Sequence, residues 1–254
     1  MTVKAKKHLG QHFLTDENIA RKIVDVLSYN DYNIVLEVGP GMGVLTKYLI
    51  EKDLQVFLAE IDTESIAYLK ENYEKINDNT FIGDFLKTDF AFAEGQALAV
   101  IGNYPYNISS QILFHIVDHY QQIPEMGGMF QKEVAERVAA VPRTKDYGIL
   151  SVLIQAYYDV KYMFTVHENV FNPPPKVKSG VIQLIRNPKE GLVGNEVLFK
   201  QIVKAGFNMR RKKLSNSLKP LGIPEHIQNH EFLDKRAEEL SVDDFIRFAK
   251  EWKS

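Results

Sequence analysis

The sequence contains no cysteine, which excludes disulfide bonds, thiolate metal sites and cysteine nucleophiles together. It also has no apolar run near the roughly 18 residues that a membrane-spanning helix needs. The first residues, MTVKAKKHLGQHFL, are basic and lack the apolar segment of a secretory signal. Neither sign of charge dominates, because 31 Lys and Arg oppose 33 Asp and Glu. We expect a soluble, cytoplasmic protein without metal or membrane partner, whose binding of any nucleic acid depends on local basic clusters.

Short apolar runs alternate with helical patterns through the first two thirds of the 254 residues. A helix is expected at 15–28 with Thr15 or Asp16 as its N-cap, and strands at 33–38, 54–60, 79–86, 97–103 and 126–131. Helical patterns at 44–52, 63–75 and 108–120 separate these strands. Such an alternation predicts an α/β fold with a Rossmann-like parallel sheet and helices on both of its faces.

Two later strands are expected at 160–166 and 179–186, separated by the stiff loop FNPPPKVKS. Beyond Arg186 only helical patterns follow, at 196–207, 210–218 and 241–252. Ser241 and Asp244 have the spacing of a capping box at the start of the last helix. We therefore expect a catalytic domain at 1–187 and a small all-helical domain at 188–254.

A glycine loop, LEVGPGMGVL, follows the first strand of the sheet and precedes a helix. Gly39, Gly41 and Gly43 lack a Cβ, so a nucleotide-like ligand can lie against this turn. A dinucleotide-binding loop needs its third glycine one position later, which opposes a NAD-dependent oxidoreductase. No Lys-Ser or Lys-Thr pair follows, which excludes a phosphate-binding P-loop.

Acidic residues stand where the next strands end. Glu60 follows Gly39 by about 20 residues, where an acid binds the hydroxyls of an unphosphorylated ribose. Asp84 adds an acceptor for an exocyclic adenine amine, and Glu37 adds negative charge within the glycine loop. S-adenosylmethionine fits this set, because carboxylates attract its sulfonium cation and it carries no phosphate. A solvated strand end is the alternative for each acid alone.

The stretch Asn103-Tyr104-Pro105-Tyr106 follows the strand at 97–103. An exocyclic adenine amine is a poor nucleophile, because its lone pair is delocalised into the ring. The Asn103 amide oxygen and a carbonyl at Tyr104 or Pro105 can accept the two amine hydrogens and so favour a pyramidal nitrogen. Tyr106 offers a face on which an unstacked base can lie. The alternative is an ordinary proline-containing turn with two half-buried tyrosines.

Taken together, GQHFL, EVGPGMGVLT, NYPYNIS, QKEVAERV, YGILSVL and FNPPPKVKS resemble the ribosomal RNA adenine dimethyltransferase family, most closely its bacterial small-subunit branch. The resemblance runs nearly end to end. It implies dimethylation of N6 on two adjacent adenines in a hairpin loop near the 3′ end of small-subunit (16S) ribosomal RNA, during subunit maturation. The expected cofactor contacts are His12, Leu14, Gly39, Gly41, Glu60, Ile61, Asp84, Phe85 and Asn103. The expected catalytic residues are Asn103, Tyr104, Pro105, Tyr106 and Phe171, the aromatic of the proline loop.

Two positions depart from the family pattern, which usually has Asn where this chain has His12 and Leu where it has Tyr104. His12 can still donate to the carboxylate of the cofactor. Tyr104 is expected to contribute chiefly a backbone carbonyl. Phe171 has an alternative as a core aromatic at the start of a loop.

An RNA substrate makes the basic clusters the expected phosphate contacts. These residues are Lys6, Lys7, Arg210, Arg211, Lys212 and Lys213. Solvated faces are the alternative, since charge runs usually have no partner. His115 and His119 have metal-like spacing, but we expect them to lie on a helix surface or in packing, because no third ligand is near.

Two other functions remain open from the sequence. One is a large-subunit (23S) ribosomal RNA adenine methyltransferase of the macrolide-resistance type, which shares the glycine loop and the Asn-x-Pro-Tyr motif. The other is a non-catalytic ribosome-assembly or transcription factor on the same fold, which the intact motif at Asn103 opposes. The expected partner is the immature small (30S) subunit, and the expected state is a monomer.

Overall fold

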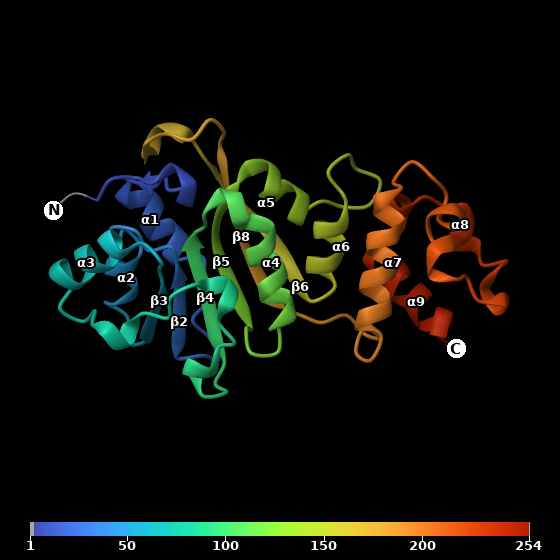
Figure 1. The fold of residues 1–254 in the computed structure, drawn as a ribbon, viewed down its shortest axis with the longest axis horizontal. Helices are drawn as coiled ribbons and strands as arrows, with labels where there is room; N and C mark the ends of the chain where they lie inside the picture. Colours follow the sequence, from blue (N-terminus) through green and yellow to red (C-terminus); the bar gives the residue numbers. More distant parts are fainter. Residues whose placement is uncertain (1–2, 254) are drawn as a thin grey trace. The chain divides into compact units, whose positions relative to one another are not determined.

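The computed structural model describes residues 3–253 (Figure 1). Its strands are β1 (Phe13–Leu14), β2 (Ile34–Val38), β3 (Gln55–Ala59), β4 (Leu98–Asn103), β5 (Glu125–Gln131), β6 (Tyr158–Val166), β7 (Phe171–Asn172) and β8 (Ser179–Arg186). Its helices are α1 (Glu17–Val24), α2 (Thr46–Leu49), α3 (Thr63–Asn72), α4 (Ser109–Asp118), α5 (Lys132–Val138), α6 (Ile149–Gln155), α7 (Glu196–Asn208), α8 (Leu214–Ser217) and α9 (Val242–Lys253). Within residues 3–253, no helix has the length and apolar character needed to cross a membrane.

A six-stranded sheet in the order β3-β2-β4-β5-β8-β6 forms the centre of the fold. β2 pairs in parallel with β3 and β4, and β4 with β5, whereas β8 is antiparallel to β5. Val35 and Ala99 pack in a cluster with Ile23 and Val24 of α1. Leu36 and Val100 point to the opposite face and are also fully buried. Both faces of these strands are therefore covered, as expected for a Rossmann-like α/β fold.

The prediction of a strand at 79–86 was wrong. Residues in this stretch make only a single bridge, between Leu58 and Phe81. Gly83 then turns the chain with φ of +83°, and residues 85–87 form a 3₁₀ turn capped by Asp84. A short apolar run next to a turn residue thus ends too soon to form a ladder.

Helix α6 was not anticipated from the sequence. Its consecutive residues Val152, Leu153 and Ile154 are all buried, and the two polar residues, Ser151 and Gln155, bond to carbonyls of residues 137–140, so no exposed polar face marks the helix in the sequence. The helix expected at 210–218 shortens to α8.

Two compact units divide the chain, one of residues up to Ala135 with Lys161–Arg186, the other of Glu136–Val160 with the rest from Asn187. The second division lies between Arg186 and Asn187, one residue before the boundary expected at 187/188. Residues 136–160, which the expected boundary assigns to the catalytic domain, group with the helical unit. Within that unit the Tyr147 hydroxyl donates to the Leu240 carbonyl at 3.0 Å, and the Arg143 amide donates to the Glu238 carbonyl at 2.8 Å. These bonds join segments far apart in sequence, which residue patterns do not reveal.

The last helix begins as expected. The Ser241 hydroxyl accepts from the Asp244 amide at 3.1 Å, and the Asp244 carboxylate accepts from the Ser241 amide at 2.9 Å. One face of α9 buries Phe245, Phe248 and Trp252. Burial of this amphipathic face stabilises the helical unit around its own core.

We predict that Gly128→Ala destabilises the fold. Gly128 has φ of +138°, and a Cβ there would lie 2.3 Å from the Gly102 carbonyl oxygen and 2.6 Å from the Tyr104 ring. Strain and overpacking should together lower the free energy of unfolding by about 2–4 kcal/mol, measured by chemical denaturation. Gly148→Ala is the control, since a Cβ there meets nothing within 4 Å. Equal stability of the two variants would contradict the crowding at Gly128.

Candidate active site

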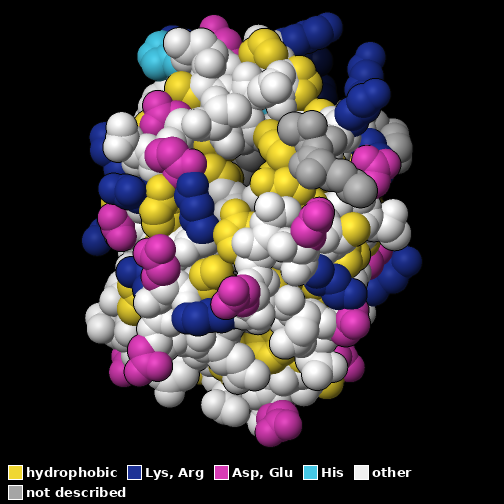
Figure 2. Space-filling model, turned by 90° about the vertical axis from the view of Figure 1, so that its left-hand side faces the viewer, with side chains coloured by type: hydrophobic (Ala, Val, Ile, Leu, Met, Phe, Trp, Pro, Cys, Tyr) yellow, Lys and Arg dark blue, Asp and Glu magenta, His cyan; other side chains and the backbone are white. Residues whose placement is uncertain are grey.

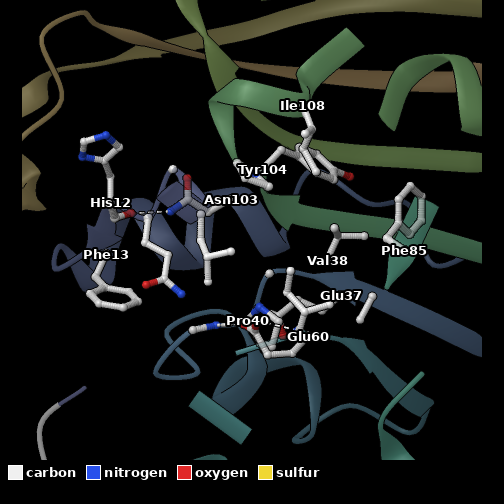
Figure 3. A pocket seen from close by; sticks show the side chains of 18 of the residues that line it. His12, Phe13, Glu37, Val38, Pro40, Glu60, Phe85, Asn103, Tyr104 and Ile108 are labelled. Carbon is white, nitrogen blue, oxygen red and sulfur yellow. Dashed lines mark hydrogen bonds between the residues drawn. The ribbon is translucent and has the colours of Figure 1, made fainter. Parts of the chain in front are cut away.

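A cavity of about 200 Å³ opens at the carboxyl ends of β2, β3 and β4 (Figure 3). Parallel strands bring the residues that follow them to one edge of the sheet, which is where ligands bind in such folds. The N-terminal segment, defined here as residues 6–14, contributes a further wall of this cavity through residues 9–14. The walls thus come from the start of the chain, the glycine loop and the stretch after β4.

The three glycines of the loop serve different purposes. Gly39 and Gly41 have φ of +68° and +55°, which favours glycine at both positions. A Cβ on Gly39 would meet only Pro105 and Asn103, at 3.8 and 3.9 Å, so this backbone faces the cavity. A Cβ on Gly41 would lie 2.8 Å from Phe13. The loop can therefore contact a ligand along its backbone at Gly39, while Gly41 admits the N-terminal segment.

Gly43 is required by packing instead of by ligand approach. A Cβ there would lie 2.7 Å from the Tyr73 ring, whose hydroxyl donates to the carbonyls of Met42 and Gly43 at 3.2 and 3.1 Å. The tyrosine thus fixes the exit of the glycine loop.

Glu60 follows β3 and is held by backbone amides. Its carboxylate accepts from Ile61 at 2.8 Å, Asp62 at 2.9 Å and Gly41 at 3.3 Å. Burial raises the pKa of this carboxyl, and the three amides oppose the rise. The arrangement presents a fixed acceptor to the cavity, suited to the hydroxyls of a ribose. It also ties the glycine loop to the end of β3.

Asp84 and Phe85 line the neighbouring wall. The Asp84 carboxylate caps the next turn by accepting from the Leu86 amide at 3.0 Å. Phe85 is buried and lies edge-on to the His115 ring, with centroids 5.1 Å apart. A polar acceptor beside an aromatic ring is a suitable surface for a flat heterocycle with an exocyclic amine.

His115 of α4 and His119, which follows its last residue, pack behind that wall, as expected. His115 Nε2 donates to the Thr88 carbonyl at 3.0 Å, and His119 Nδ1 donates to the His115 carbonyl at 2.9 Å. Both rings contact Phe90. Within residues 3–253, no group of three or more His, Cys, Asp or Glu could hold a metal ion.

Glu37 is a buried acid beneath the glycine loop, and its side chain is one of those that line the cavity. The Thr46 hydroxyl donates to its carboxyl at 2.6 Å. Burial raises the pKa of Glu37 to about 8, an effect that the hydroxyl only partly offsets. The carboxyl is therefore largely protonated at neutral pH.

Asn103, the last residue of β4, has a fixed orientation. Its amide nitrogen donates to the backbone carbonyl of His12 at 2.9 Å, the dashed line beside these residues in Figure 3. A carbonyl can only accept, so Nδ2 must face His12, and Oδ1 occupies the other branch of the amide. The N-terminal segment thereby leaves an acceptor oxygen at the end of β4.

Tyr104 lies with its side chain in the core, which agrees with the backbone role expected for it. Its hydroxyl donates to the Gly127 carbonyl at 2.8 Å, and its ring stacks on Phe130 with centroids 4.4 Å apart. The Pro105 carbonyl accepts from the Ile108 amide and the Ser109 hydroxyl. Of the two carbonyls left open by the sequence, the geometry therefore favours that of Tyr104 as the acceptor for a substrate.

Tyr106 lines the cavity and is held from two sides. Its hydroxyl is hydrogen-bonded to the Ser179 hydroxyl at the start of β8. Its ring lies 5.6 Å from the His12 ring, centroid to centroid. These contacts fix the orientation of the ring in the wall of the cavity.

All nine expected cofactor contacts line this single cavity, from His12 and Leu14 to Phe85 and Asn103. Asn103 to Tyr106 line it as well. Phe171 does not: it is 4% exposed and packs in the core cluster beside Leu14, with which it is paired between β1 and β7. The alternative of a core aromatic therefore describes Phe171 in this structure.

Sequence reasoning missed several other lining residues, chiefly Phe13, Val38, Pro40 and Ile108. Figure 3 shows them among the labelled side chains around the cavity. Phe13, Val38 and Pro40 are adjacent in sequence to expected contacts, and Ile108 lies two residues after Tyr106, so extending each motif by one or two residues would have found them.

The side chains expected to contact RNA differ in whether they already have partners within the protein. Lys6 is paired with Asp62 and Glu64. Arg210 donates to Glu238 at 2.6 Å and to the carbonyls of Lys145 and Thr144. Lys213 is paired with Asp234 at 2.9 Å. Lys7, Arg211 and Lys212 are exposed.

Comparisons with known proteins place this site in context. A family model described as Ribosomal RNA adenine dimethylase matches residues 2–254. A curated protein from Flavobacterium johnsoniae, named Ribosomal RNA small subunit methyltransferase A, is 55% identical over 245 residues, which cover 96% of this chain and 94% of that protein. A protein of the same name from Bacteroides thetaiotaomicron is 53% identical over 96% of this chain and 92% of its own length.

Solved structures show the same fold. A dimethyladenosine transferase from Plasmodium falciparum is similar with a TM-score of 0.81 at 26% identity, over 95% of this chain and 98% of the other. The 23S rRNA methyltransferase ErmE is similar with a TM-score of 0.71 at 24% identity, over 95% and 100%. At that identity the second likeness concerns the fold alone.

We predict that binding of a cationic ligand in this cavity releases a proton from Glu37. Because burial raises the pKa of Glu37 to about 8, affinity should increase as the pH rises from about 6 to about 8. Calorimetry with S-adenosylmethionine in buffers of different ionisation enthalpy measures the proton release. Glu37→Gln should abolish it; an unchanged release in that variant would remove Glu37 as its source.

The same pKa affects the free protein. Between the ordinary pKa of 4.5 and about 8, folded Glu37 keeps a proton that the unfolded chain loses. The stability contributed by this proton is complete at low pH and is lost as the pH rises through about 8. Relative to Glu37→Gln, the wild type should therefore lose stability over this range.

Proposed function

This chain belongs to the ribosomal RNA adenine dimethylase family, and we propose that it dimethylates N6 of two adjacent adenines in a hairpin loop near the 3′ end of small-subunit (16S) ribosomal RNA. It is a methyltransferase that acts on ribosomal RNA and uses S-adenosylmethionine. The observation that carries the proposal is the amide of Asn103, oriented by His12 at the edge of the cavity. The names of the curated relatives support the small subunit as the source of the RNA.

The residues of the cavity suit the cofactor. Bound there, S-adenosylmethionine supplies an activated methyl group on a sulfonium. Glu60 is placed to accept from ribose hydroxyls, and Asp84 with Phe85 to hold the adenine ring. Glu37 offers the charge that compensates a cation. The backbone at Gly39 allows close approach of the ligand.

The acceptor amine needs two hydrogen-bond acceptors on one side. We assign these to Asn103 Oδ1 and the Tyr104 carbonyl, which come from consecutive residues at the end of β4. Accepting both amine hydrogens favours a pyramidal nitrogen with its lone pair directed at the methyl group. The residues act by position and polarity, and the amine loses its proton after transfer. This role requires an oxygen at residue 103, which the His12 carbonyl guarantees.

The target adenine must leave its stack in the RNA before its amine can reach Asn103 and the Tyr104 carbonyl. Tyr106 presents a ring at the mouth of the cavity, on which a flipped adenine can lie. We assign the stacking to Tyr106, because Phe171 is buried beside Leu14 in the state described. Stacking on one aromatic ring offsets part of the cost of unstacking.

The RNA backbone is held by local basic residues. Figure 2 shows Lys and Arg interspersed with Asp and Glu on the face it presents, without a broad area of one sign. We propose Arg211 and Lys212 in the helical unit and Lys7 in the N-terminal segment as phosphate contacts, since their side chains are exposed. Arg210 has a structural role, since its guanidinium binds Glu238 and two carbonyls. The physiological substrate is the immature small subunit in the bacterial cytoplasm, approached by a monomer.

A labelling experiment tests the proposed function directly. The protein is incubated with labelled S-adenosylmethionine and, in separate reactions, with unmethylated small subunits and with unmethylated large-subunit RNA, and the modified adenines are mapped. We expect two adjacent dimethyladenines. Methylation of large-subunit RNA alone would support the macrolide-resistance type, and binding without methylation would support an assembly factor.

We predict that Asn103→Ala keeps the fold and lowers methyl transfer by about 10²- to 10³-fold, the scale for removing one preorganised polar partner at a reacting centre. The monomethylated amine has one hydrogen left, so the second transfer depends more strongly on orientation. Monomethyladenine should therefore accumulate, as measured by mass spectrometry of digested RNA. Asn72→Ala, at the exposed end of α3, is the control. Wild-type rates and product ratios for Asn103→Ala would exclude the role of this amide.

We predict that Arg211→Ala with Lys212→Ala weakens RNA binding and reduces its salt dependence by a slope of roughly 1.4, at about 0.7 per phosphate contact. The matched control replaces two consecutive residues of α1, Arg21→Ala with Lys22→Ala, because this removes the same charges from exposed positions. Arg210→Ala should instead lower the stability by about 1–2 kcal/mol through lost hydrogen bonds. Equal salt slopes for the two pairs would show that Arg211 and Lys212 form a solvated face.

A further inference from the structure

His12 joins three parts of the site. Its backbone carbonyl accepts from Asn103 at 2.9 Å, its ring Nδ1 lies 2.8 Å from the Pro173 carbonyl oxygen, and its ring contacts that of Tyr106. Figure 3 shows the ring directed away from Glu60 and Phe85. The side chain at residue 12 therefore faces the proline loop, defined as residues 171–179, and not the part of the cavity where the ribose and adenine are expected.

The proline loop is held at its other end too. Ser179, which is fully buried, shares a hydrogen bond with the Tyr106 hydroxyl. The loop is thus fixed at Pro173 through His12 and at Ser179 through Tyr106. Asn103 is therefore connected to His12, His12 to the proline loop, and the proline loop to Tyr106.

The partner of Nδ1 shows which ring nitrogen of His12 carries a hydrogen. A peptide carbonyl accepts and cannot donate, so Nδ1 must carry a hydrogen. An Asn side chain places its amide nitrogen near the position of Nδ1 and can donate in the same way. Leu has a similar size and cannot donate. These two substitutions separate the hydrogen bond from the bulk of the side chain.

We propose that His12 is a positioning residue, whose Nδ1–H holds the proline loop against Tyr106 so that the target adenine is presented to Asn103 in one orientation. This inference rests on the proposed function for its effect on catalysis. Without the tether, residues 173–178 gain freedom, while β7 stays paired with β1. The ring of Tyr106 then loses its neighbour, and the acceptor base is held less firmly while the cofactor pocket is unchanged.

The test compares His12→Leu, His12→Asn and wild type, with His167→Leu as a control at an exposed histidine outside the site. Hydrogen exchange is measured on the free protein at Asn172 and at residues 176–178, because the prolines of the loop carry no amide hydrogen. The affinity for S-adenosylmethionine is measured by calorimetry, and the kcat and product ratio are measured with unmethylated small subunits. His12→Leu should increase exchange in the loop, lower kcat about five- to tenfold and raise the share of monomethyladenine, with cofactor affinity within about twofold of wild type. His12→Asn should restore all three values.

Other results would overturn the inference. Weaker cofactor binding in His12→Leu, with wild-type kcat at saturating cofactor, would make the ring a cofactor ligand instead. Unchanged loop exchange would show that the tether does not hold the loop. A failure of His12→Asn to restore exchange would exclude the donated hydrogen bond. Because exchange is read on the free protein, it decides the tether even if wild type fails to methylate the RNA and the proposed function falls.

Discussion

The hydrogen bond from the Asn103 amide to the His12 carbonyl is the interaction on which the site depends. It requires the N-terminal segment to lie across the cavity, and several contacts hold it there. The Gln11 side chain donates to Asp62 at 3.1 Å, and Phe13 and Leu14 pair with Asn172 and Phe171. The orientation of one catalytic amide is thus set by residues from β1, β7 and the start of α3. An amide without such a partner could present either its oxygen or its nitrogen to a substrate.

Close backbone packing supplies the second constraint. Gly102 and Gly128 are opposite each other in β4 and β5, and the Tyr104 ring lies against both. Because neither glycine has a side chain, the ring can turn into the core and reach the Gly127 carbonyl. The backbone of Tyr104 is then held at the strand end while its side chain contributes only packing. A tyrosine at residue 104 therefore leaves the position of its backbone carbonyl unchanged, but it requires glycine at residues 102 and 128.

The sequence was sufficient for features that depend on local patterns. Strong apolar runs predicted β2 and β4, the glycine loop predicted the ligand edge, and Ser241 with Asp244 predicted the start of α9. It failed where a long-range contact decides the outcome. The pairing of β1 with β7, the hydrogen bonds of Arg210 and the bond from Tyr147 to Leu240 all arise from partners far away in the chain. The polar residues of α6 bond to carbonyls within the protein, so no exposed polar face marked its helix either.

The cavity specifies chemistry more than it specifies an RNA. An oriented amide, a neighbouring carbonyl and an acid for a ribose are what any N6 adenine methyltransferase with this cofactor needs. We expect selection of the RNA to depend on residues outside the cavity that contact the RNA around the target adenine. On a chain with net charge −2, we expect the phosphate contacts to come from a small number of exposed basic side chains such as Arg211 and Lys212, which would position the RNA.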